Sequence, residues 1–568
     1  MSDWSKVTRP IPVPNEWTKP FWEAAKRGVL ELQRCQSCGY FQHPPYPTCT
    51  QCVATDLKFE PVRGLGTINA YTIMYHPGDK RFASAVPYAS IIVELDDAPG
   101  ALLAGNLLGA PYTEAKVGRR VEIVFEKLND DITLPQFRLA NTEASPPPFP
   151  PPHAGRVREG CRQRPRRSGE EENAMWKNRC KVAVSGVGFS KVTRSAEIPL
   201  AAHALTAVKE AVADSGLQMS DVDGLATYPE LPATGHAEVD GISVVSVNCM
   251  MAMLKLPNLS WHIQVGTTNI GGAVQQAVNA LLAGVCKYAV VWRAMHNPRG
   301  TYQNLPGTQA QGAAQFTAPY GFGGPGQGMA VAYTRWLERH NQNREKMATL
   351  AVTQRHHTQH NPHAYFYGTQ LSREDYLNSR MVAYPFCLFD CDIPVQGAVA
   401  IVLTTADRAR DLKPRPAYLA GYGQRLHFEV AGRIGSLADY MEGGRSSAKL
   451  TWERSGFGPQ DVDVAQIYDG FSASVIYGLE SYGFCEQGTA LDFIQDGRIE
   501  LNGELPLNTF GGSLGTGRIH GLWHIIEGAL QASGRAGSRQ VKDANVSFVG
   551  ASAPIVTGTT FIFVREPY

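Results

Sequence analysis

The sequence predicts a layered α/β domain that is preceded by a small, mostly β module. Beyond residue 175, apolar runs of strand length alternate with longer helix-like segments, and glycine-rich turns follow the strands. This alternation is typical of α/β layers with mixed sheets. Before residue 141, several short β-like runs follow one another, as in a small barrel.

Length and composition exclude several classes of protein. A chain of 568 residues is too long for one hydrophobic core, so about two to four domains are expected. The formal net charge of +1 argues against a nucleic-acid binder, which needs a strongly basic surface. No apolar run approaches the roughly 20 residues that span a bilayer. The N-terminal segment lacks a signal-peptide pattern, so we expect a cytoplasmic location.

A proline-rich stretch divides the chain. Residues 145–153 read SPPPFPPPH, and the residues that follow are mostly charged and poor in aliphatic side chains. Such a segment cannot join a packed core and acts as a tether. The expected regions are a helix and cysteine ribbon at 1–60, a barrel at 61–144, the tether at 145–174 and the α/β domain at 175–568. Recurring glycine turns indicate a duplicated unit in the last region, with halves of about 175–410 and 411–568.

Individual elements follow from hydrophobic periodicity. Residues 16–33 have the spacing of an amphipathic helix, with Trp17, Phe21 and Trp22 among its apolar residues. The expected barrel strands are 66–74, 88–95, 102–108 and 120–125. The expected strands of the α/β domain are 182–189, 261–265, 288–292, 398–404, 417–424, 464–468, 546–549 and 559–564, with helices such as 272–283 and 521–532 between them.

Four cysteines follow the predicted N-terminal helix in two pairs. Cys35 and Cys38 are separated by two residues, as are Cys49 and Cys52, and ten residues lie between the pairs. Each turn of this kind brings two thiolates to one ion, and two turns complete a tetrahedral zinc site without an open position. The sequence therefore predicts a structural zinc ion.

The helix, ribbon and barrel resemble a known family of accessory proteins. The stretches GLGTINAYT (64–72), VPYASIIVELDD (86–97) and VGRRVEIVFE (117–126) carry this resemblance, which covers nearly all of residues 10–141. They look like the OB-fold and rubredoxin-like zinc-ribbon proteins that accompany thiolase-like enzymes. The resemblance implies an OB barrel that serves an acyl-CoA enzyme and does not bind nucleic acid.

The second part resembles the thiolase superfamily, in particular its sterol-carrier-protein branch. The match runs from about residue 182 to 564 and includes YPFCLFDCDIPVQGAVAIVL (384–403), IYDGFSASVIYGLESYGFCEQG (467–488) and NTFGGSLGTGRIHG (508–521). The resemblance implies a thiolase fold made of a duplicated α/β/α unit. It also implies an acyl-CoA substrate and a homodimer that forms through a sheet edge in the first half.

The nucleophile of true thiolases is missing. They carry a cysteine at a strand-to-helix turn, where its pKa is lowered. The corresponding segment, 262–277, reads HIQVGTTNIGGAVQQA, and Thr267 or Thr268 falls near the cysteine position. The Gly-His-Pro motif is replaced by Gly-Arg-Ile at 517–519, and the last cysteine motif, at 549–558, contains no thiol. These changes argue against covalent acyl transfer.

Four residues are candidates for the remaining chemistry. Tyr468 stands where the sterol-carrier branch has a histidine, and it is the candidate acid or base. Its pKa of about 10 must fall before it can act as a base near neutrality, and Arg518 is a cation that could lower it. His520 is a candidate proton donor or part of the oxyanion site. Asp469 either takes part in proton transfer or caps a helix.

Substrate-binding candidates lie in two turns. Backbone N–H groups from Thr268 onward would lie at a helix N-terminus, and Asn508, Gly511 and Gly512 match the family's turn before the histidine motif. Alternative interpretations remain. Tyr468 is also explained as a core tyrosine, and Arg518 as a ligand of a CoA phosphate or a partner of Asp469. The histidines at 356, 357, 360 and 363 fit a polar helix end better than a metal site.

A thiolase-like chain that lacks the nucleophilic cysteine and stands beside a zinc-ribbon OB module resembles the steroid side-chain aldolases of bacterial sterol catabolism. In that family the two parts are separate subunits, which cleave a 17-hydroxy steroid acyl-CoA to a 17-ketosteroid and a short acyl-CoA, here propionyl-CoA. The resemblance implies a lyase with Tyr468 as its catalytic tyrosine. Arg518 stands where some members have a second tyrosine. Two other functions remain open: an acyltransferase or condensing enzyme of the same fold, and a non-catalytic acyl-CoA-binding scaffold.

Overall fold

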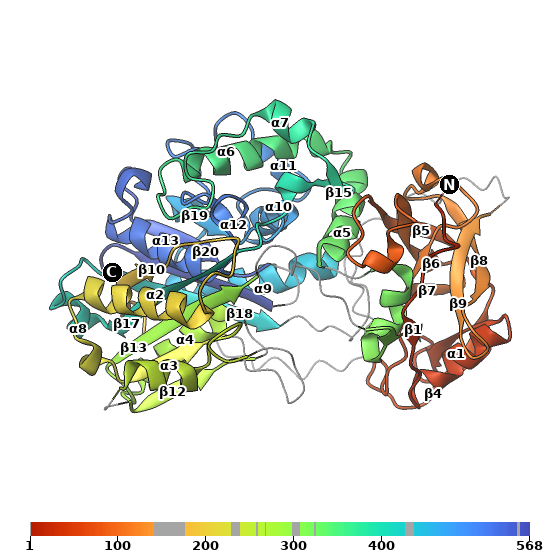
Figure 1. The fold of residues 1–568 in the computed structure, drawn as a ribbon, viewed down its shortest axis with the longest axis horizontal. Helices are drawn as coiled ribbons and strands as arrows, with labels where there is room; N and C mark the ends of the chain where they lie inside the picture. The colour runs from red at the N-terminus through yellow and green to blue at the C-terminus, as the bar shows by residue number, and fades with distance from the viewer. Residues whose placement is uncertain are drawn as a thin grey trace, which may run out of the picture. The chain divides into compact units, whose positions relative to one another are not determined.

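The computed structural model of the chain forms two compact units, each treated separately below (Figure 1). The first contains residues 1–174 with 305–335 and 430–434, and the second contains the rest. The structure describes residues 2–140, 176–228, 239–256, 259–266, 269–297, 307–322, 325–426, 437–553 and 557–567. Among these residues, no helix is both long and apolar enough to cross a bilayer.

A short helix and a three-stranded ribbon begin the first unit. The helix α1 covers Lys19–Lys26, and β2 (Leu30–Cys35) pairs antiparallel with β3 (Phe41–Gln42) and β4 (Leu57–Val62). The helix expected at 16–33 is therefore too long. It ends before Gly28, which has a φ of 77°, a left-handed conformation that glycine adopts easily at helix ends.

The barrel follows the ribbon. Its strands are β5 (Leu65–Met74), β6 (Tyr88–Leu95), β7 (Ala98–Asn106), β8 (Arg120–Lys127) and β9 (Thr133–Leu139). Strand β5 pairs with β6 and β8, β6 also pairs with β7, and β8 also pairs with β9. A bridge between Leu107 and Phe137 joins the ends of this order. A closed five-stranded barrel is the OB architecture that the sequence predicts.

A segment from late in the sequence belongs to the first unit. Strand β1 (Ile11–Pro12) pairs with β14 (Gln309–Ala310). Trp22 donates its indole N–H to Gln315 at 2.8 Å and stacks on Phe316, with ring centroids 5.6 Å apart. Sequence alone assigns this segment to the α/β region. Its contacts lie with the ribbon and barrel because the buried face of α1 packs against it.

The second unit contains a mixed sheet. Among the described residues its order is β12-β11-β13-β17-β10-β18-β21-β20-β19. The strands are β10 (Val182–Phe189), β11 (Gly224–Thr227), β12 (Trp261–Gln264), β13 (Tyr288–His296), β17 (Gln396–Thr405), β18 (Ala417–Leu426), β19 (Val464–Ile467), β20 (Val546–Gly550) and β21 (Thr557–Val564). A short hairpin, β15 (Met381–Ala383) and β16 (Phe386–Cys387), lies outside this order.

The sheet is built from one pattern used twice. In the first half, β10 pairs antiparallel with β17, β17 antiparallel with β13, and β13 parallel with β11. In the second half, β18 pairs antiparallel with β21, β21 antiparallel with β20, and β20 parallel with β19. The halves meet where β10 pairs with β18. This repetition confirms the duplicated unit that the sequence predicts.

Helices cover both faces of each half. They are α2 (Leu200–Ser215), α3 (Val247–Leu254), α4 (Ile270–Leu282), α6 (Ala348–Thr358), α7 (Arg373–Leu377), α8 (Ala406–Arg410), α9 (Leu437–Ser455), α10 (Ser472–Ser481), α11 (Ala490–Phe493), α12 (Gly512–Thr516) and α13 (Leu522–Ser533), and α5 (Pro325–Arg339) has residues in both units. Helices α2 and α3 pack on one face of the first half. Helices α4 and α13 share a core with strands of both halves.

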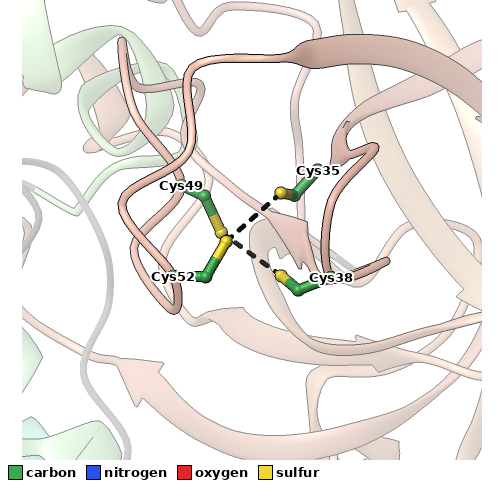
Figure 2. A group of neighbouring side chains, drawn as sticks. All are labelled: Cys35, Cys38, Cys49 and Cys52. Atoms are coloured by element: carbon green, nitrogen blue, oxygen red, sulfur yellow. Dashed lines mark hydrogen bonds between the residues drawn. The ribbon is translucent and has the colours of Figure 1, made fainter. Parts of the chain in front are cut away.

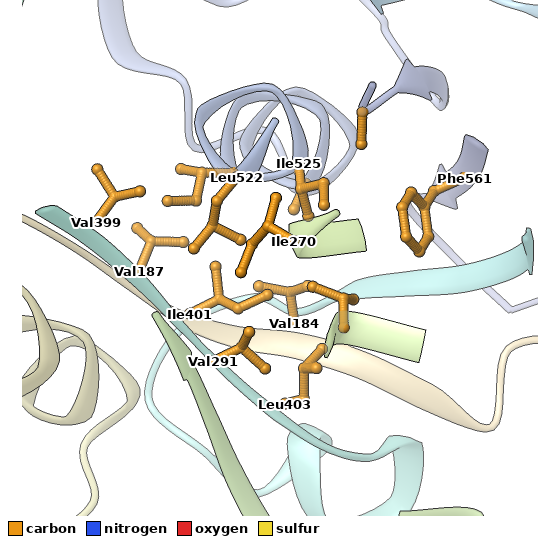
Figure 3. Packing of buried hydrophobic residues seen from close by; sticks show 14 of the residues in the cluster. Val184, Val187, Ile270, Val291, Val399, Ile401, Leu403, Leu522, Ile525 and Phe561 are labelled. Carbon is orange, nitrogen blue, oxygen red and sulfur yellow. The ribbon is translucent and has the colours of Figure 1, made fainter. Parts of the chain in front are cut away.

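That shared core fixes the place of the candidate site. Figure 3 shows Ile270 of α4 and Leu522 of α13 among strand residues such as Val184 and Ile401. Burying a side chain of this size stabilises the fold by about 1.5–3 kcal/mol. Because α4 and α13 begin beside these strands, their N-terminal turns are held rigidly. The candidate catalytic residues lie at one of these turns and at a nearby strand end.

Candidate functional site

The four cysteines of the ribbon converge. All four Sγ atoms lie within 4.8 Å of one another, and Cys35–Cys52 and Cys38–Cys49 are each 3.6 Å apart (Figure 2). A tetrahedral ion with Zn–S bonds of about 2.3 Å places its sulfurs about 3.8 Å apart. The thiolates therefore fit one Zn²⁺ with no position left for substrate, and the zinc is structural.

Tyr468 directly follows β19, and Asn508 holds the strand end that presents it. Asn508 accepts a hydrogen bond from the Ile467 N–H at 2.7 Å and donates one to the Ile467 carbonyl at 2.8 Å. The Tyr468 N–H donates to the Gly550 carbonyl at 2.9 Å. The amide of Asn508 is thus used within the fold. Its binding of substrate remains a prediction.

Asp469 is fully buried, and its side chain lies against the N-terminus of α12. Its carboxylate accepts hydrogen bonds from the backbone N–H groups of Ser513 and Leu514, at 2.7 and 3.1 Å, and lies 3.0 Å from His524 Nε2. This is the helix-capping arrangement that was one of its two expected roles. Its part in proton transfer stays a prediction.

Two glycines at the start of this helix, Gly511 before it and Gly512 as its first residue, are required by its close packing. A Cβ atom on Gly512 would lie 2.1 Å from Asp469 Oδ2, and one on Gly511 would lie 2.3 Å from Thr358 Cγ2. Both glycines also have positive φ values, of 62° and 101°. They let the α12 N-terminus approach Asp469. Their expected contact with substrate is not tested by this packing.

The pKa of Tyr468 is raised, whereas the sequence-based expectation required it to fall. Burial raises the pKa of this phenol, Asp392 and Asp469 raise it further, and Arg518 and Arg293 lower it by less. The expectation that the pKa of Tyr468 falls is therefore wrong, although Arg518 does act to lower it. The guanidinium of Arg518 lies 3.4 Å from Asp392 Oδ2, so much of its field is cancelled. Its expected pairing with Asp469 is replaced by this pair.

His520 lies in the turn before α13 and is neutral. Burial, followed by the charges of Arg293 and Arg518, holds the pKa of its imidazole well below the usual value. Its Nδ1 lies 3.3 Å from Arg293 Nε and 3.2 Å from Nη2. The ring of Tyr228 is 5.9 Å from the His520 ring, between centroids. An imidazole of this kind serves as a hydrogen-bond donor better than as a charged acid.

The turn before α4 is partly described. Thr268 lies outside the described residues, and so does Thr267. Asn269 caps the helix by accepting a hydrogen bond from the Gly271 N–H at 2.9 Å, and its amide donates to Thr559 at 3.0 Å. The proposed donor set at this helix start therefore remains a prediction.

The histidines of α6 lie near a carboxylate but form no metal cluster. His356 and His357 are 3.3 and 3.6 Å from Glu500 Oε2. The hydrogen bond from His357 lowers the pKa of Glu500 to about 2. Within the described ranges, the four ribbon cysteines are the only group of three or more residues able to hold a metal.

Sequence reasoning missed three residues of the candidate site. Arg293 interrupts the apolar strand YAVVWRAMH, a signal that a buried charge has a task. Asp392 lies within the stretch that carries the thiolase resemblance. His524 follows His520 by one helical turn and reaches Asp469. No local pattern links these residues to Tyr468, since the fold alone brings them together.

Three family models match the chain. They are "Thiolase C-terminal domain-like" at residues 432–565, "ChsH2, C-terminal OB-fold domain" at 59–126 and "ChsH2, rubredoxin-like zinc ribbon domain" at 22–58. The fold and these matches define a thiolase-like protein that carries a zinc-ribbon and OB-fold module. This confirms the fold class predicted from the sequence.

Comparison with whole proteins is more specific. A 17-hydroxy-3-oxo-4-pregnene-20-carboxyl-CoA lyase of Mycobacterium tuberculosis is 35% identical over 368 residues, 62% of this chain and 91% of that protein. A steroid side-chain-cleaving aldolase of Thermomonospora curvata is 34% identical over 359 residues, 61% of this chain and 88% of that protein. The solved Ltp2-ChsH2(DUF35) aldolase has a TM-score of 0.61 at 30% identity, covering 68% of this chain and 99% of that one. The chain belongs to the family of thiolase-like steroid side-chain-cleaving aldolases.

Proposed function

We propose that the protein is an acyl-CoA carbon–carbon lyase that cleaves a β-hydroxyacyl-CoA by a retro-aldol reaction. The proposed substrate is a 17-hydroxy steroid side-chain CoA ester, and the products are a 17-ketosteroid and propionyl-CoA. The observation that carries this proposal is the placement of a protonated phenol, Tyr468, in a cluster with Arg518 and the buried carboxylates Asp392 and Asp469. Such a cluster can move protons without a covalent intermediate.

Tyr468 would act as a neutral proton relay. Because its pKa is raised, the phenol carries its proton in the resting enzyme. The phenol oxygen takes the proton of the substrate's β-hydroxyl as the phenol proton passes to the α-carbon. As the bond between the α- and β-carbons breaks, its electron pair is delocalised into the thioester with enolate character and takes up the phenol proton at the α-carbon, while the β-carbon becomes a ketone. The phenol ends as it began, so no phenolate is required.

His520 and the turns around it would stabilise the enolate. Negative charge develops on the thioester oxygen when the carbon–carbon bond breaks, and fixed hydrogen-bond donors lower the energy of that charge. The neutral His520 ring supplies one donor, and the N–H groups near Thr268 are candidates for others. Arg518, which lies near Tyr468 and His520, adds a smaller electrostatic contribution, because Asp392 offsets much of its charge.

The alternative of acyl transfer is weaker. It needs a thiolate, and Cys391 is the cysteine that precedes Asp392 of the cluster in the chain. Burial, together with Asp390 and Asp392, raises the pKa of Cys391 well above its usual value. A protonated, buried thiol is a poor nucleophile. Burial also raises the pKa of Cys286 to about 12. The non-catalytic scaffold is disfavoured by the retained proton-transfer groups.

A homodimer and a cytoplasmic location complete the proposal. Strand β12 lies at the edge of the sheet among the described strands, and its Trp261 and Ile263 are only partly buried. Met251 and Met253 of α3, also partly buried, pack against the core on the face of the first half that α2 and α3 cover. An incomplete apolar edge of this kind is typical of a subunit contact. Sedimentation equilibrium of the full chain tests the dimer, since a monomer at micromolar concentration contradicts it.

Product analysis tests the reaction. The full chain is incubated with the 17-hydroxy steroid CoA ester in D₂O, and the products are identified by mass spectrometry. We expect equal amounts of 17-ketosteroid and propionyl-CoA, with one deuterium at the α-carbon of propionyl-CoA. Intact ester after saturable binding would contradict lyase activity on this substrate. Transfer of the acyl group to added free CoA would favour the acyltransferase instead.

A further inference from the structure

The hydrogen-bond partner of His520 can only donate. Arg293 approaches His520 Nδ1 with two nitrogens, at 3.3 and 3.2 Å. A guanidinium carries N–H groups, accepts no hydrogen bond and stays protonated in proteins. Nδ1 must therefore be the acceptor. The single ring proton of the neutral imidazole is then left on Nε2.

Arg293 is itself held in place. It lies within β13, with 6% of its surface exposed. Its Nη1 donates to the carbonyl of Ala294, and Nη2 lies 3.5 Å from the sulfur of Met295. The guanidinium carbon lies 5.3 Å from the ring centre of Tyr228, within range of a cation–π interaction. These contacts give the guanidinium little freedom to turn away from His520.

The backbone of His520 is fixed as well. Its φ of 45° lies in the left-handed region, which only a few per cent of residues other than glycine adopt. The next residue, Gly521, packs so closely that a Cβ atom would lie 1.7 Å from the Ala551 carbonyl oxygen. Strained backbone of this kind is common at functional sites. Both the ring's position and its proton are therefore determined.

We propose that Arg293 is a positioning residue that locks His520 in the neutral form protonated on Nε2, so that His520 donates this hydrogen bond to the thioester oxygen as the enolate forms. The inference rests on the proposed lyase function. It assigns His520 the role of an uncharged donor and excludes the role of an imidazolium acid. A second ring proton, on Nδ1, would point directly at a cation.

The groups that face His520 support the same protonation state. Arg293 approaches from β13, Arg518 from the same turn, and Tyr228 from the end of β11. Arg518 is partly neutralised by Asp392, at 3.4 Å, whereas Arg293 contacts the ring directly. Two nearby cations disfavour a third positive charge. Arg293 is therefore the residue whose removal should change both the tautomer and the titration of His520.

The direct test measures which ring nitrogen of His520 carries the proton in the unmodified full chain. The protein is labelled with ¹⁵N-histidine, and two-bond ¹⁵N–¹H correlations are recorded, with His520→Gln used to assign the signal. We expect a neutral ring protonated on Nε2 from about pH 6 to pH 8, the range in which an ordinary histidine titrates. An imidazolium, or a ring protonated on Nδ1, would overturn the inference.

Variants separate positioning from simple packing. Arg293→Met should let the ring sample both tautomers and should raise the pKa of the imidazole, although burial and Arg518 still hold that pKa below its ordinary value. It should lower kcat by about 10²-fold, the cost of one misdirected donor, with KM changed much less. Arg518→Met is the matched control, because it removes a nearby cation and leaves the Nδ1 donor in place. Its His520 should keep the proton on Nε2.

Arg293→Lys retains a cationic donor and should recover part of the Nε2 signature and part of kcat. If Arg293→Met leaves the tautomer and kcat unchanged, the inference is wrong. The two proposals fail separately. A locked Nε2 proton in a protein that cleaves no β-hydroxyacyl-CoA contradicts the lyase function, whereas cleavage with an unlocked His520 contradicts the role of Arg293.

Discussion

The zinc site and the candidate active site are assembled in opposite ways. The four zinc ligands come from 18 consecutive residues, Cys35 to Cys52, and fill every coordination position of the ion. His520 and Arg293 are 227 residues apart in sequence and are brought together by the fold. Local spacing therefore reveals the structural site, whereas the catalytic geometry depends on the whole fold.

The two sites also differ in how completely their polar groups are used. In the zinc site each of the four thiolates is a ligand of the same ion. Near Asp469, the described residues provide no hydrogen-bond partner for the buried side-chain amide of Gln354 or for His524 Nδ1. Buried polar atoms without partners are costly, and they concentrate where function requires them. The contrast predicts that the zinc site is essential for folding and the second site for chemistry.

The largest expected effect is the loss of folding when a zinc ligand of the ribbon is replaced. Cys49→Ser should abolish zinc binding and unfold the ribbon, because structural zinc contributes on the order of 10 kcal/mol to such folds. Metal analysis and limited proteolysis measure both results. Cys286→Ser is the control, since this buried cysteine lies in the second unit and its loss should leave one zinc per chain. A folded, zinc-free ribbon in Cys49→Ser would break the comparison.

The segment at 305–335 provides the next test of the first unit. Trp22→Ala removes a buried indole that donates to Gln315 and stacks on Phe316. We expect it to destabilise this unit by about 3–5 kcal/mol, as measured by chemical denaturation. Trp17→Ala is the matched control, because Trp17 is 47% exposed and its loss should change stability by less than about 0.5 kcal/mol. Equal effects of the two variants would show that the segment does not support α1.

A change at Asp469 tests whether a substitution in the candidate active site lowers activity without unfolding the protein, unlike a substitution of a zinc ligand. Asp469→Asn replaces one acceptor by a donor that faces the N–H groups of α12. We expect about a 10²-fold loss of kcat, since α12 and His524 shift relative to Tyr468, with zinc content unchanged. Steady-state kinetics and metal analysis give both values. Unchanged kcat would remove Asp469 from the account of the site.

The pH dependence is the smallest expected effect. Because the pKa of Tyr468 is raised and its phenol works as a neutral relay, kcat should stay nearly flat from about pH 7 to pH 9. A phenolate base would instead give a rate that rises with pH until it levels off above the phenol pKa. Initial rates across this range distinguish the two. A tenfold rise per pH unit in the native enzyme would contradict the relay.

Much of this organisation is present in the sequence. The cysteine spacing indicates the zinc ligands, the recurring strands and glycine turns indicate the duplicated unit, and motif order places Tyr468 at a strand end. The direction of its pKa shift could not be predicted, because Asp392 and the depth of burial become visible only in the folded chain. The role of Arg293 has the same origin, since its partner, His520, lies in the other half of the duplicated domain.

The central claim is that Tyr468 moves a proton during carbon–carbon cleavage without a covalent acyl-enzyme. We would compare single-turnover cleavage of the 17-hydroxy steroid CoA ester by the native chain, Tyr468→Phe and Tyr482→Phe. Tyr482 is a buried tyrosine of the same half whose hydroxyl has no partner in the described part of the chain, so its variant controls for loss of a phenol hydroxyl. We predict a loss of about 10³-fold in Tyr468→Phe, near-native rates in Tyr482→Phe, and substrate binding retained in both. Native cleavage rates in Tyr468→Phe would contradict the account.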